Sequence, residues 1–320
     1  MKVFAVVLTL LFISTPGFAQ PFQEAEALRE ANDFDAIEAL VAGHVDGDGE
    51  QAAEANYWMS RVAMFRGEID DAVDYIEAAI EMNPGQSRYQ LAAGNAYGRS
   101  AQEASFFKQM GLAKKSKRAY VKAVELDPNS IPARRGLIGY LSNAPGIAGG
   151  DIDEARAQAQ AIAEIDQIEG LLSLAGIELA DEQPKQAMAY YRQILEIDPE
   201  HINARFNLAM ASAAEEDYDT AFAGLEDVIE RDPEHLQANY QYGRLASMSE
   251  LNLEKGIERF DRFLELGPDQ TPNWRAWANY RAGMIYEKLE QPDVALARYR
   301  TAYQIDPEHE EAEEAIDRLE

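Results

Sequence analysis

The chain has 320 residues, of which 47 % are hydrophobic, so it can bury a large core. It carries 57 acidic against 29 basic residues, and its net charge of −28 disfavours nucleic acid and anionic membrane surfaces as partners. It contains no cysteine, which excludes disulfides, thiolate catalysis and zinc sites built on cysteine.

The first 19 residues have the pattern of an export signal. Lys2 precedes an apolar run from Val3 to Ser14, and Ala19 provides the small residue that signal peptidase requires. The run is too short to cross a bilayer, which takes about 20 apolar residues. We therefore predict cleavage after Ala19. The mature chain would then be periplasmic, or alternatively secreted, and would have no membrane span.

A short sequence motif recurs along the rest of the chain, each time at the end of a predicted helix. Its copies read EIDPEH at 196–201, ERDPEH at 230–235 and QIDPEH at 304–309, and looser versions end near Pro84, Pro128 and Pro268. Between 171 and 199 the apolar residues follow a 3.6-residue period, which predicts two amphipathic helices of about a dozen residues each. Two successive closing prolines are separated by 34 residues, a period that indicates stacked helix hairpins.

Small and aromatic residues recur at matching positions in successive copies. Two copies read Ala282, Gly283, Tyr286, Ala295, Tyr299 and Pro307, and Ala93, Gly94, Tyr97, Tyr120, Ala123 and Pro128. The small residues allow two helices to approach closely, and the aromatic rings fill the space beside them. This pattern resembles the tetratricopeptide repeat (TPR) family. The resemblance implies an all-α, right-handed solenoid that binds a protein or peptide in a concave groove.

We predict a single solenoid over 20–320. About seven hairpins are expected at 53–84, 87–128, 131–166, 168–199, 202–233, 236–268 and 270–307, after a degenerate hairpin at 24–43 and before a capping helix at 308–320. About ten extra residues around 104–112 should lengthen both helices of the second hairpin. The turn of the third hairpin, within YLSNAPGIAGGDIDEA at 140–155, resembles exported bacterial TPR proteins of undefined role.

Three patterns suggest a chemical function. The glycines at 146, 149 and 150 suggest a phosphate loop, but Asp151 follows where a lysine is required, so we expect a turn with Asp151 capping the next helix. A calcium loop beginning at Asp46 fails because Gln51 replaces the required glycine. Histidines 201, 235 and 309 are expected to be exposed turn residues. We predict no catalytic residue, no metal, no cofactor and no enzymatic activity.

The TPR resemblance also implies which side chains face the groove. Six of them are basic and only three, Glu54, Glu169 and Glu287, are acidic, which inverts the balance of the whole chain. The predicted partner-binding residues are Tyr57, Arg61, Phe65, Arg88, Asn95, Arg99, Arg135, Phe206, Tyr240, Arg244, Trp277, Tyr280 and Lys288.

These residue types favour a protein interface, because Arg, Tyr, Trp and Met are enriched there. We predict an exported scaffold or adaptor that binds a protein or peptide, and an acidic segment or a free C-terminus would suit the arginines. The alternatives are a periplasmic holdase or envelope assembly factor that binds many clients, and an enzyme or small-ligand binder at the 144–155 turn. The sequence identifies neither the partner nor the oligomeric state.

Overall fold

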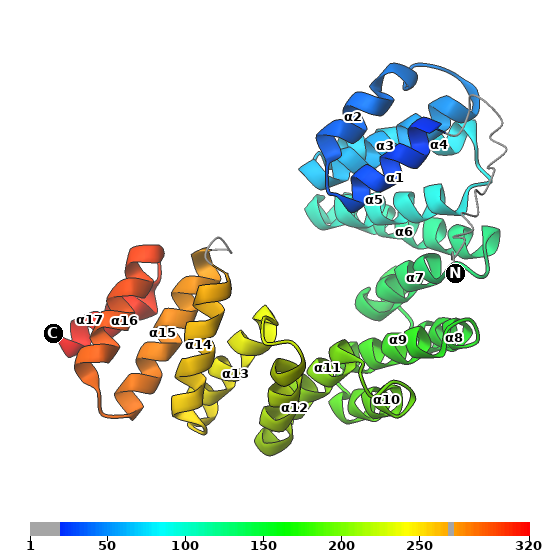
Figure 1. Cartoon of the computed structure of the whole chain (residues 1–320). Helices are drawn as coiled ribbons and strands as arrows, with labels where there is room; N and C mark the ends of the chain where they lie inside the picture. The colour runs from blue at the N-terminus through cyan, green and yellow to red at the C-terminus, as the bar shows by residue number, and fades with distance from the viewer. Residues whose placement is uncertain (1–19, 268–271) are drawn as a thin grey trace, which may run out of the picture. The chain divides into compact units, whose positions relative to one another are not determined.

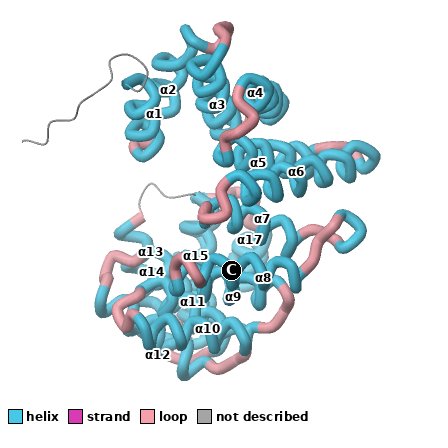
Figure 2. The backbone as a smooth tube through the Cα atoms, turned by 90° about the vertical axis from the view of Figure 1, so that its right-hand side faces the viewer, coloured by secondary structure: helices cyan, strands magenta, loops and turns pink. Residues whose placement is uncertain are grey.

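The computed structural model describes residues 20–267 and 272–320, and all the regular structure within these ranges is helical (Figures 1 and 2). The α-helices are α1 Gln20–Glu30, α2 Phe34–Val41, α3 Gly49–Arg66, α4 Ile69–Met82, α5 Ser87–Glu103, α6 Phe106–Leu126, α7 Ile131–Asn143, α8 Ile152–Ala163, α9 Gln167–Ala180, α10 Pro184–Ile197, α11 Ile202–Ala214, α12 Tyr218–Arg231, α13 Leu236–Ser249, α14 Leu253–Leu266, α15 Pro272–Lys288, α16 Pro292–Ile305 and α17 Glu310–Leu319. Two short 3-10 helices are η1 Ala42–His44 and η2 Gly146–Ala148. The predicted export signal lies outside the described residues.

Consecutive helices from α3 to α16 form seven pairs, and every pair except α7 and α8 packs closely. Helices α3 and α4 form the first hairpin, and α15 and α16 form the last. In the third hairpin, Arg134 on α7 donates a hydrogen bond to the amide oxygen of Gln158 on α8. A short pair, α1 and α2, precedes the hairpins, and α17 packs on α16 at the C-terminal end. The predicted all-α array, with its N-terminal hairpin and C-terminal capping helix, is confirmed.

The chain divides into two compact units, residues 1–162 and 163–320. The core of the first unit includes Trp58, Ile76 and Tyr89, which are almost fully buried. The core of the second unit is built on Tyr242 and Phe260 among other apolar residues. Each unit therefore has its own hydrophobic core, made by the inward faces of its helices.

Close helix packing depends on glycines that lie against aromatic rings. A Cβ atom at Gly94 on α5 would lie 2.5 Å from the ring of Tyr120 on α6, and one at Gly283 would lie 2.6 Å from the ring of Tyr299. The pair Gly243 and Phe260 repeats the arrangement at 2.7 Å. The predicted role of the small and aromatic positions is thus confirmed, because any larger residue would overlap the ring.

The recurrent Asp-Pro-Glu-His turn closes one hairpin and begins the next helix. Asp198 accepts a hydrogen bond from the backbone N–H of Glu200 at 3.0 Å, and His201 Nδ1 accepts one from the N–H of Ala204 at 3.0 Å. His235 caps α13 in the same way, through the N–H of Ala238 at 3.1 Å. The expectation of exposed histidines is wrong here, since His201 and His235 are half-buried helix caps and His309 is buried.

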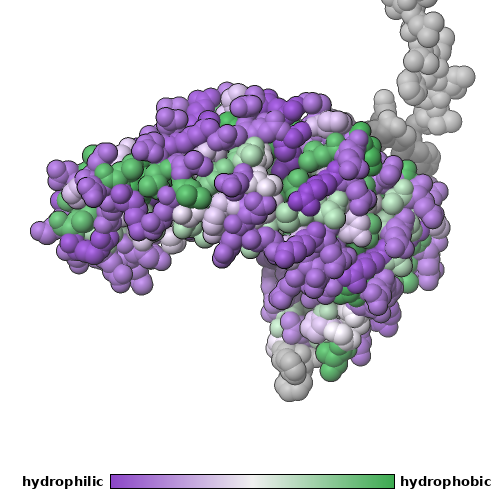
Figure 3. Space-filling model, turned by 90° about the horizontal axis from the view of Figure 1, so that it is seen from below, coloured by the Kyte–Doolittle hydropathy of each residue, from purple (hydrophilic) through white to green (hydrophobic). Residues whose placement is uncertain are grey.

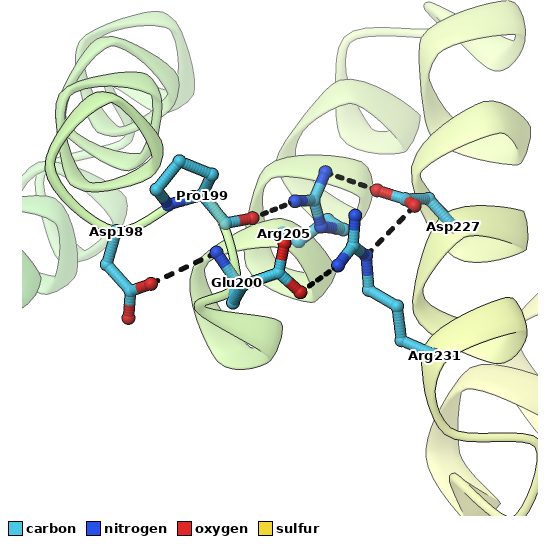
Figure 4. A network of polar contacts seen from close by, with 6 residues as sticks. All are labelled: Asp198, Pro199, Glu200, Arg205, Asp227 and Arg231. Atoms are coloured by element: carbon cyan, nitrogen blue, oxygen red, sulfur yellow. Dashed lines mark hydrogen bonds and ion pairs between the residues drawn. The ribbon is translucent and has the colours of Figure 1, made fainter.

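An ion network fastens one of these turns to the following hairpin (Figure 4). Arg205 on α11 bonds the carbonyl of Pro199 and pairs with Asp227 on α12. Arg231 pairs with Glu200 in the turn and, at 3.0 Å, with Asp227. The turn is thus joined to both helices of the hairpin that follows it.

Three carboxylates each join three successive helices. Glu287 on α15 accepts hydrogen bonds from the hydroxyl of Tyr299 on α16 and from Arg318 on α17. Bonds from Arg318 and Tyr299 hold the pKa of Glu287 below its usual value of 4.5. Glu77 on α4 and Glu226 on α12 have the same kind of partners, a tyrosine on the next helix and a lysine on the helix after that.

Candidate functional site

The second hairpin is longer than its neighbours, as the extra residues predicted. Helix α6 has 21 residues, against 14 in α4, and α5 has 17, against 18 in α3 and 13 in α7. Figure 2 shows the two long helices side by side. The added turns are the C-terminal end of α5 and the N-terminal end of α6, so both helices continue past the part of the hairpin that a shorter repeat would cover.

A cavity of about 830 Å³ lies between these added turns, α7 and the turn that follows α7. This volume is in the range of sites that hold small molecules or peptide side chains. It is lined by Gly98, Ala101, Gln102, Gln109, Met110, Ala113, Ser116, Tyr120, Arg135, Gly136, Gly139, Tyr140, Asn143, Ala144, Pro145 and Ala148. All of these residues belong to the first unit.

Small residues on α7 keep the cavity open. Gly136 lies so close to Tyr120 that a Cβ there would be 2.7 Å from the ring, and Gly139, one turn further along, has no atom within 4 Å of the position that a Cβ would occupy. Tyr120 is nearly buried, and its hydroxyl donates a hydrogen bond to Asn95 at 2.7 Å. Burial raises the pKa of Tyr120 to about 12, so the ring is neutral and forms a fixed wall.

The turn 144–151 is held in place from two sides of the cavity. The hydroxyl of Tyr140 donates a hydrogen bond to the carbonyl of Ala148 at 2.7 Å, and Lys117 Nζ on α6 donates one to the carbonyl of Gly149 at 2.9 Å. Gly150 is essential to this turn, because a Cβ there would lie 1.8 Å from the carbonyl oxygen of Ala144. The turn therefore forms a rigid wall of the cavity.

The same turn does not form a phosphate loop. The backbone N–H groups of Gly149, Gly150 and Asp151 already donate to the carbonyls of Gly146, Pro145 and Leu141. The Asp151 carboxylate accepts a hydrogen bond from the N–H of Glu154 at 3.0 Å, which confirms the expected helix cap. With its N–H groups directed inward and a carboxylate at the start of α8, the turn is unsuited to an anion.

The chemistry of the lining favours an apolar group held among amides. Met110, Ala113, Tyr120 and the glycines supply apolar surface, and Gln102, Gln109 and Asn143 supply hydrogen-bonding groups around it. An extended peptide has both features, because it carries apolar side chains on a backbone that needs hydrogen bonds. The sequence predicted Arg135 as a groove residue and the 144–155 turn as an alternative ligand site, and both contribute to this lining. The contributions of α5 and α6 were missed, although the inserted residues and the two α7 glycines pointed to them.

In the first unit, the predicted groove residues are distributed between core, rim and surface. Tyr57 is buried and stacks on Tyr89 with ring centroids 5.1 Å apart. Phe65 is 62 % exposed and stacks on Phe34 at 3.9 Å. Asn95 is exposed and accepts the bond from Tyr120 described above. Arg135 lies in the cavity wall, so it is the predicted residue that the structure places in the candidate site.

In the second unit, the four predicted aromatic residues lie in three groups of packed rings. Tyr240 is buried beside Trp274 and Phe263, with ring centroids 4.8 and 5.1 Å away. Trp277 and Tyr280 lie 5.6 Å apart, and both contact His309. Phe206 stacks on His235 at 5.4 Å. The four predicted rings contribute mainly to helix packing, since each is buried or half-buried against its neighbours.

Most of the predicted basic groove residues already have a partner in the chain. The groups they bond are Tyr57 for Arg61, Glu54 for Arg88, Glu103 for Arg99, Gln241 for Arg244 and Glu250 for Lys288. Glu54 is buried and also accepts hydrogen bonds from Trp58 and Tyr89. A carboxylate of a partner protein would have to compete with these groups.

Hydrophobic patches interrupt a mostly hydrophilic surface (Figure 3). The large apolar side chains that are most exposed include Ile147, at 82 %, and Met248, at 58 %. Ile147 belongs to η2, directly beside the cavity-lining residue Ala148. Within residues 20–267 and 272–320, no group of acidic and histidine side chains is arranged to hold a metal ion. No described helix has the length and apolar character needed to cross a membrane.

Comparison with protein families matches models of the tetratricopeptide repeat at residues 53–86, 101–130, 168–201, 203–235 and 278–309. The chain belongs to the tetratricopeptide repeat family. The matched ranges in this TPR protein cover helices from the first, second, fourth, fifth and seventh hairpins. TPR proteins generally mediate protein–protein interaction.

Two solved structures show the same fold at low sequence identity. The TPR protein TTC0263 from Thermus thermophilus is 19 % identical, with a TM-score of 0.50 over 61 % of this chain and 98 % of its own. A tetratricopeptide repeat protein from Parabacteroides merdae is 14 % identical, with a TM-score of 0.51 over 84 % of this chain and 99 % of its own. A search of the curated proteins finds no significant relative of this TPR protein.

Proposed function

We propose that this TPR protein is an exported scaffold or adaptor, and that it binds an extended segment of a partner protein in the cavity formed by α5, α6, α7 and the 144–148 turn. The cavity carries the proposal, because it depends on two features peculiar to this part of the chain, the 21-residue helix α6 and the Ala-Pro-Gly turn. One or two apolar side chains of the segment would fill it, and the amides at its rim would bond the segment's backbone.

Export is part of the same proposal. Its support is the signal-like pattern of residues 1–19, which ends at Ala19. Fractionation of a bacterium that expresses the full chain, followed by N-terminal sequencing, tests it. A periplasmic or secreted protein that begins at Gln20 is expected, and an unprocessed protein in the cytoplasm would contradict it.

Gly139 offers a substitution that blocks the cavity without harming the fold. A Cβ there meets no atom within 4 Å, and the residue lies in the interior of α7. Replacing a helical glycine should raise stability by about 0.5–1 kcal/mol. Gly139→Met should therefore melt no lower than the natural protein, while its side chain occupies the space meant for the partner.

The matched control is Gly176→Met. Gly176 is also in a helix interior, is exposed and has no atom within 4 Å of its Cβ position, but it lies on α9 in the second unit. Pull-down from envelope extract with each protein, followed by mass spectrometry, should identify a partner that the natural chain and Gly176→Met retain and Gly139→Met loses. Equal capture by all three proteins would refute the cavity as the binding site.

A holdase is the second candidate, and the exposed Phe65 and Met248 side chains favour it. Such a protein would suppress the aggregation of many unfolded clients through dispersed apolar contacts. Gly139→Met should then protect a model client as well as the natural chain does, and high salt should not weaken the protection. A small molecule bound in the same cavity would appear as a defined added mass in native mass spectrometry of the purified protein. This measurement therefore distinguishes a small-molecule ligand from a protein partner.

A further inference from the structure

The three helices that surround the cavity, α5, α6 and α7, together carry a charge opposite to that of the chain. Residues 87–143 hold ten of the 29 basic residues and only three of the 57 acidic ones. Helix α6 is the most basic element, with six lysines and arginines and a single acid, Glu125. In a protein with a net charge of −28, one strongly basic helix is a local feature that the overall composition conceals.

These cations lie on the face of α6 turned away from the cavity. At 3.6 residues per turn, Lys108, Lys114, Lys115, Arg118 and Lys122 fall within an arc of about 120°, opposite the cavity-lining residues of the same helix. All five are exposed. Lys117, the sixth cation, falls on the cavity side and bonds the turn instead. We define the five exposed residues as the basic strip.

Much of the charge on the basic strip is unneutralised. Lys115 pairs with Glu77 at 3.0 Å and Lys122 with Glu125 at 3.1 Å. Lys108, Lys114 and Arg118 form no ion pair with any described residue. Gly111 lies between them on the same face, and a Cβ there would meet nothing within 4 Å, so a ligand backbone can approach the helix closely. Like charges one turn apart repel each other, and an anionic ligand would relieve that repulsion.

The surroundings of the basic strip decide what kind of anion fits. The strip is about 21 Å long at 1.5 Å per residue and only one helix wide. Acids border it on α4, where Glu77 contacts Lys115 and where Asp74 and Glu81 lie one turn to either side. A flat anionic membrane would press against these acids as well, whereas a narrow chain would lie along the cations alone.

We propose that the basic strip of α6 is a docking surface for an acidic segment of another protein, separate from the cavity on the opposite face of the helix. Carboxylates spaced along the segment would pair with Lys108, Lys114 and Arg118. The binding would be electrostatic, fast and sensitive to salt, because exposed charges are screened within about 8–10 Å at ordinary ionic strength. This surface does not depend on the proposed function of the cavity.

The direct test measures binding of a fluorescein-labelled peptide of alternating Glu and Ser to the purified mature protein by fluorescence anisotropy, with a Lys and Ser peptide as the charge-reversed probe. The natural chain should bind the acidic peptide, and raising the salt from about 50 to about 300 mM should weaken binding at least roughly tenfold, a salt effect on the order of that seen for multiply charged ligands. The basic peptide should bind elsewhere on the acidic surface, independently of α6.

Two variants locate the site. Lys114→Glu with Arg118→Glu should weaken acidic-peptide binding about tenfold or more, since two contacts become repulsions. Lys114→Gln with Arg118→Gln should also weaken binding of the acidic peptide, but by less. Because it introduces no new charge, it separates the loss of binding from any folding defect. The control, Lys185→Glu with Arg192→Glu, changes the net charge equally on exposed positions of α10 and should bind within about twofold of the natural chain.

Three results would overturn the proposal. The first is that the natural chain does not bind the acidic peptide. The second is that the α10 control loses as much affinity for the acidic peptide as the α6 variant does. The third is that the natural chain binds phosphatidylglycerol vesicles but not the peptide, which would make the strip a membrane contact. Gly139→Met should bind the acidic peptide normally, so failure of the cavity and failure of the basic strip are separable.

Discussion

Gly94→Ala is a sharp test of how the helices of the first unit pack. A Cβ at this position would lie 2.5 Å from two ring carbons of Tyr120, where an ordinary contact is 3.4–4 Å. The ring would have to retreat by about 1 Å, but the same ring carbons also lie against Gly136, where a Cβ would be only 2.7 Å away, and the hydroxyl of Tyr120 is bonded to Asn95. The added methyl group therefore cannot be accommodated by moving the ring.

The expected magnitude follows from two opposing effects. Overpacking of an enclosed site costs about 2–3 kcal/mol, at the upper end of the usual range. Replacing a glycine inside a helix by alanine returns up to about 1 kcal/mol. Gly94→Ala should thus lower the free energy of unfolding of the first unit by about 1–2 kcal/mol. Gly111→Ala, an exposed position of α6 with nothing within 4 Å, should instead raise it by about 0.5–1 kcal/mol.

Tryptophan fluorescence can follow the first unit separately. Of the three tryptophans, Trp58 alone lies in this unit and is almost fully buried, so replacing Trp274 and Trp277 by Phe leaves a single local probe. Urea unfolding in that background gives the midpoint and slope for each variant. Equal stability of Gly94→Ala and Gly111→Ala would show that the Tyr120 ring has room for a methyl group. If Tyr120→Leu makes Gly94→Ala harmless, the two positions are coupled, as close packing requires.

Three further predictions concern caps, charges and the odd turn. His235→Ala should destabilise the second unit by about 1 kcal/mol, because the N–H at the start of α13 loses its acceptor. His235→Asn should not, because the asparagine side chain can also accept that hydrogen bond. Thermal unfolding measures both variants. Arg318 lowers the pKa of Glu287, so the stabilisation from this carboxylate is complete above pH 4.5 and is lost as the pH falls through the lower folded-state pKa. The stability of Glu287→Gln, measured by circular dichroism, should therefore depend less on pH in the acid range than that of the natural chain. Asp151→Ala should lower the free energy of unfolding by about 1 kcal/mol and leave the chain folded. Gly150→Ala should lower it by more and disturb the cavity. Urea unfolding of the two variants measures both effects.

The fold was largely predictable from the sequence because its signals are local and repeated. The 3.6-residue apolar period, the closing prolines and the pairing of Gly94 with Tyr120 each reflect contacts within a single hairpin, and the structure bears them out. The lengthened α5 and α6 followed from a simple count of inserted residues. Each of these inferences needed no knowledge of a third helix.

The candidate site was harder to predict because it depends on three helices and a turn together. Arg135 was singled out from its repeat position, but the cavity beside it exists only where the added turns of α5 and α6 continue past the short α7. Burial of Tyr57 and Tyr240 was missed for a related reason. A repeat position predicts the side of the helix, while the size of the neighbouring residues decides whether an aromatic ring there reaches solvent or joins the core.

The basic strip was missed because groove positions were assigned on the first helix of each hairpin, and α6 is a second helix. The basic residues on the two faces of α6 need separate explanations. On the cavity side, Lys117 must reach the carbonyl of Gly149 to hold the turn, which needs one cation. That requirement accounts for none of the five cations on the opposite face, of which three have no acid partner among the described residues. Like-charge repulsion along one helix is unfavourable, so neither folding nor the cavity supplies a reason for them. Binding of an anionic partner to that face supplies one, and it would tie an acidic segment and a cavity-bound segment to the same rigid hairpin.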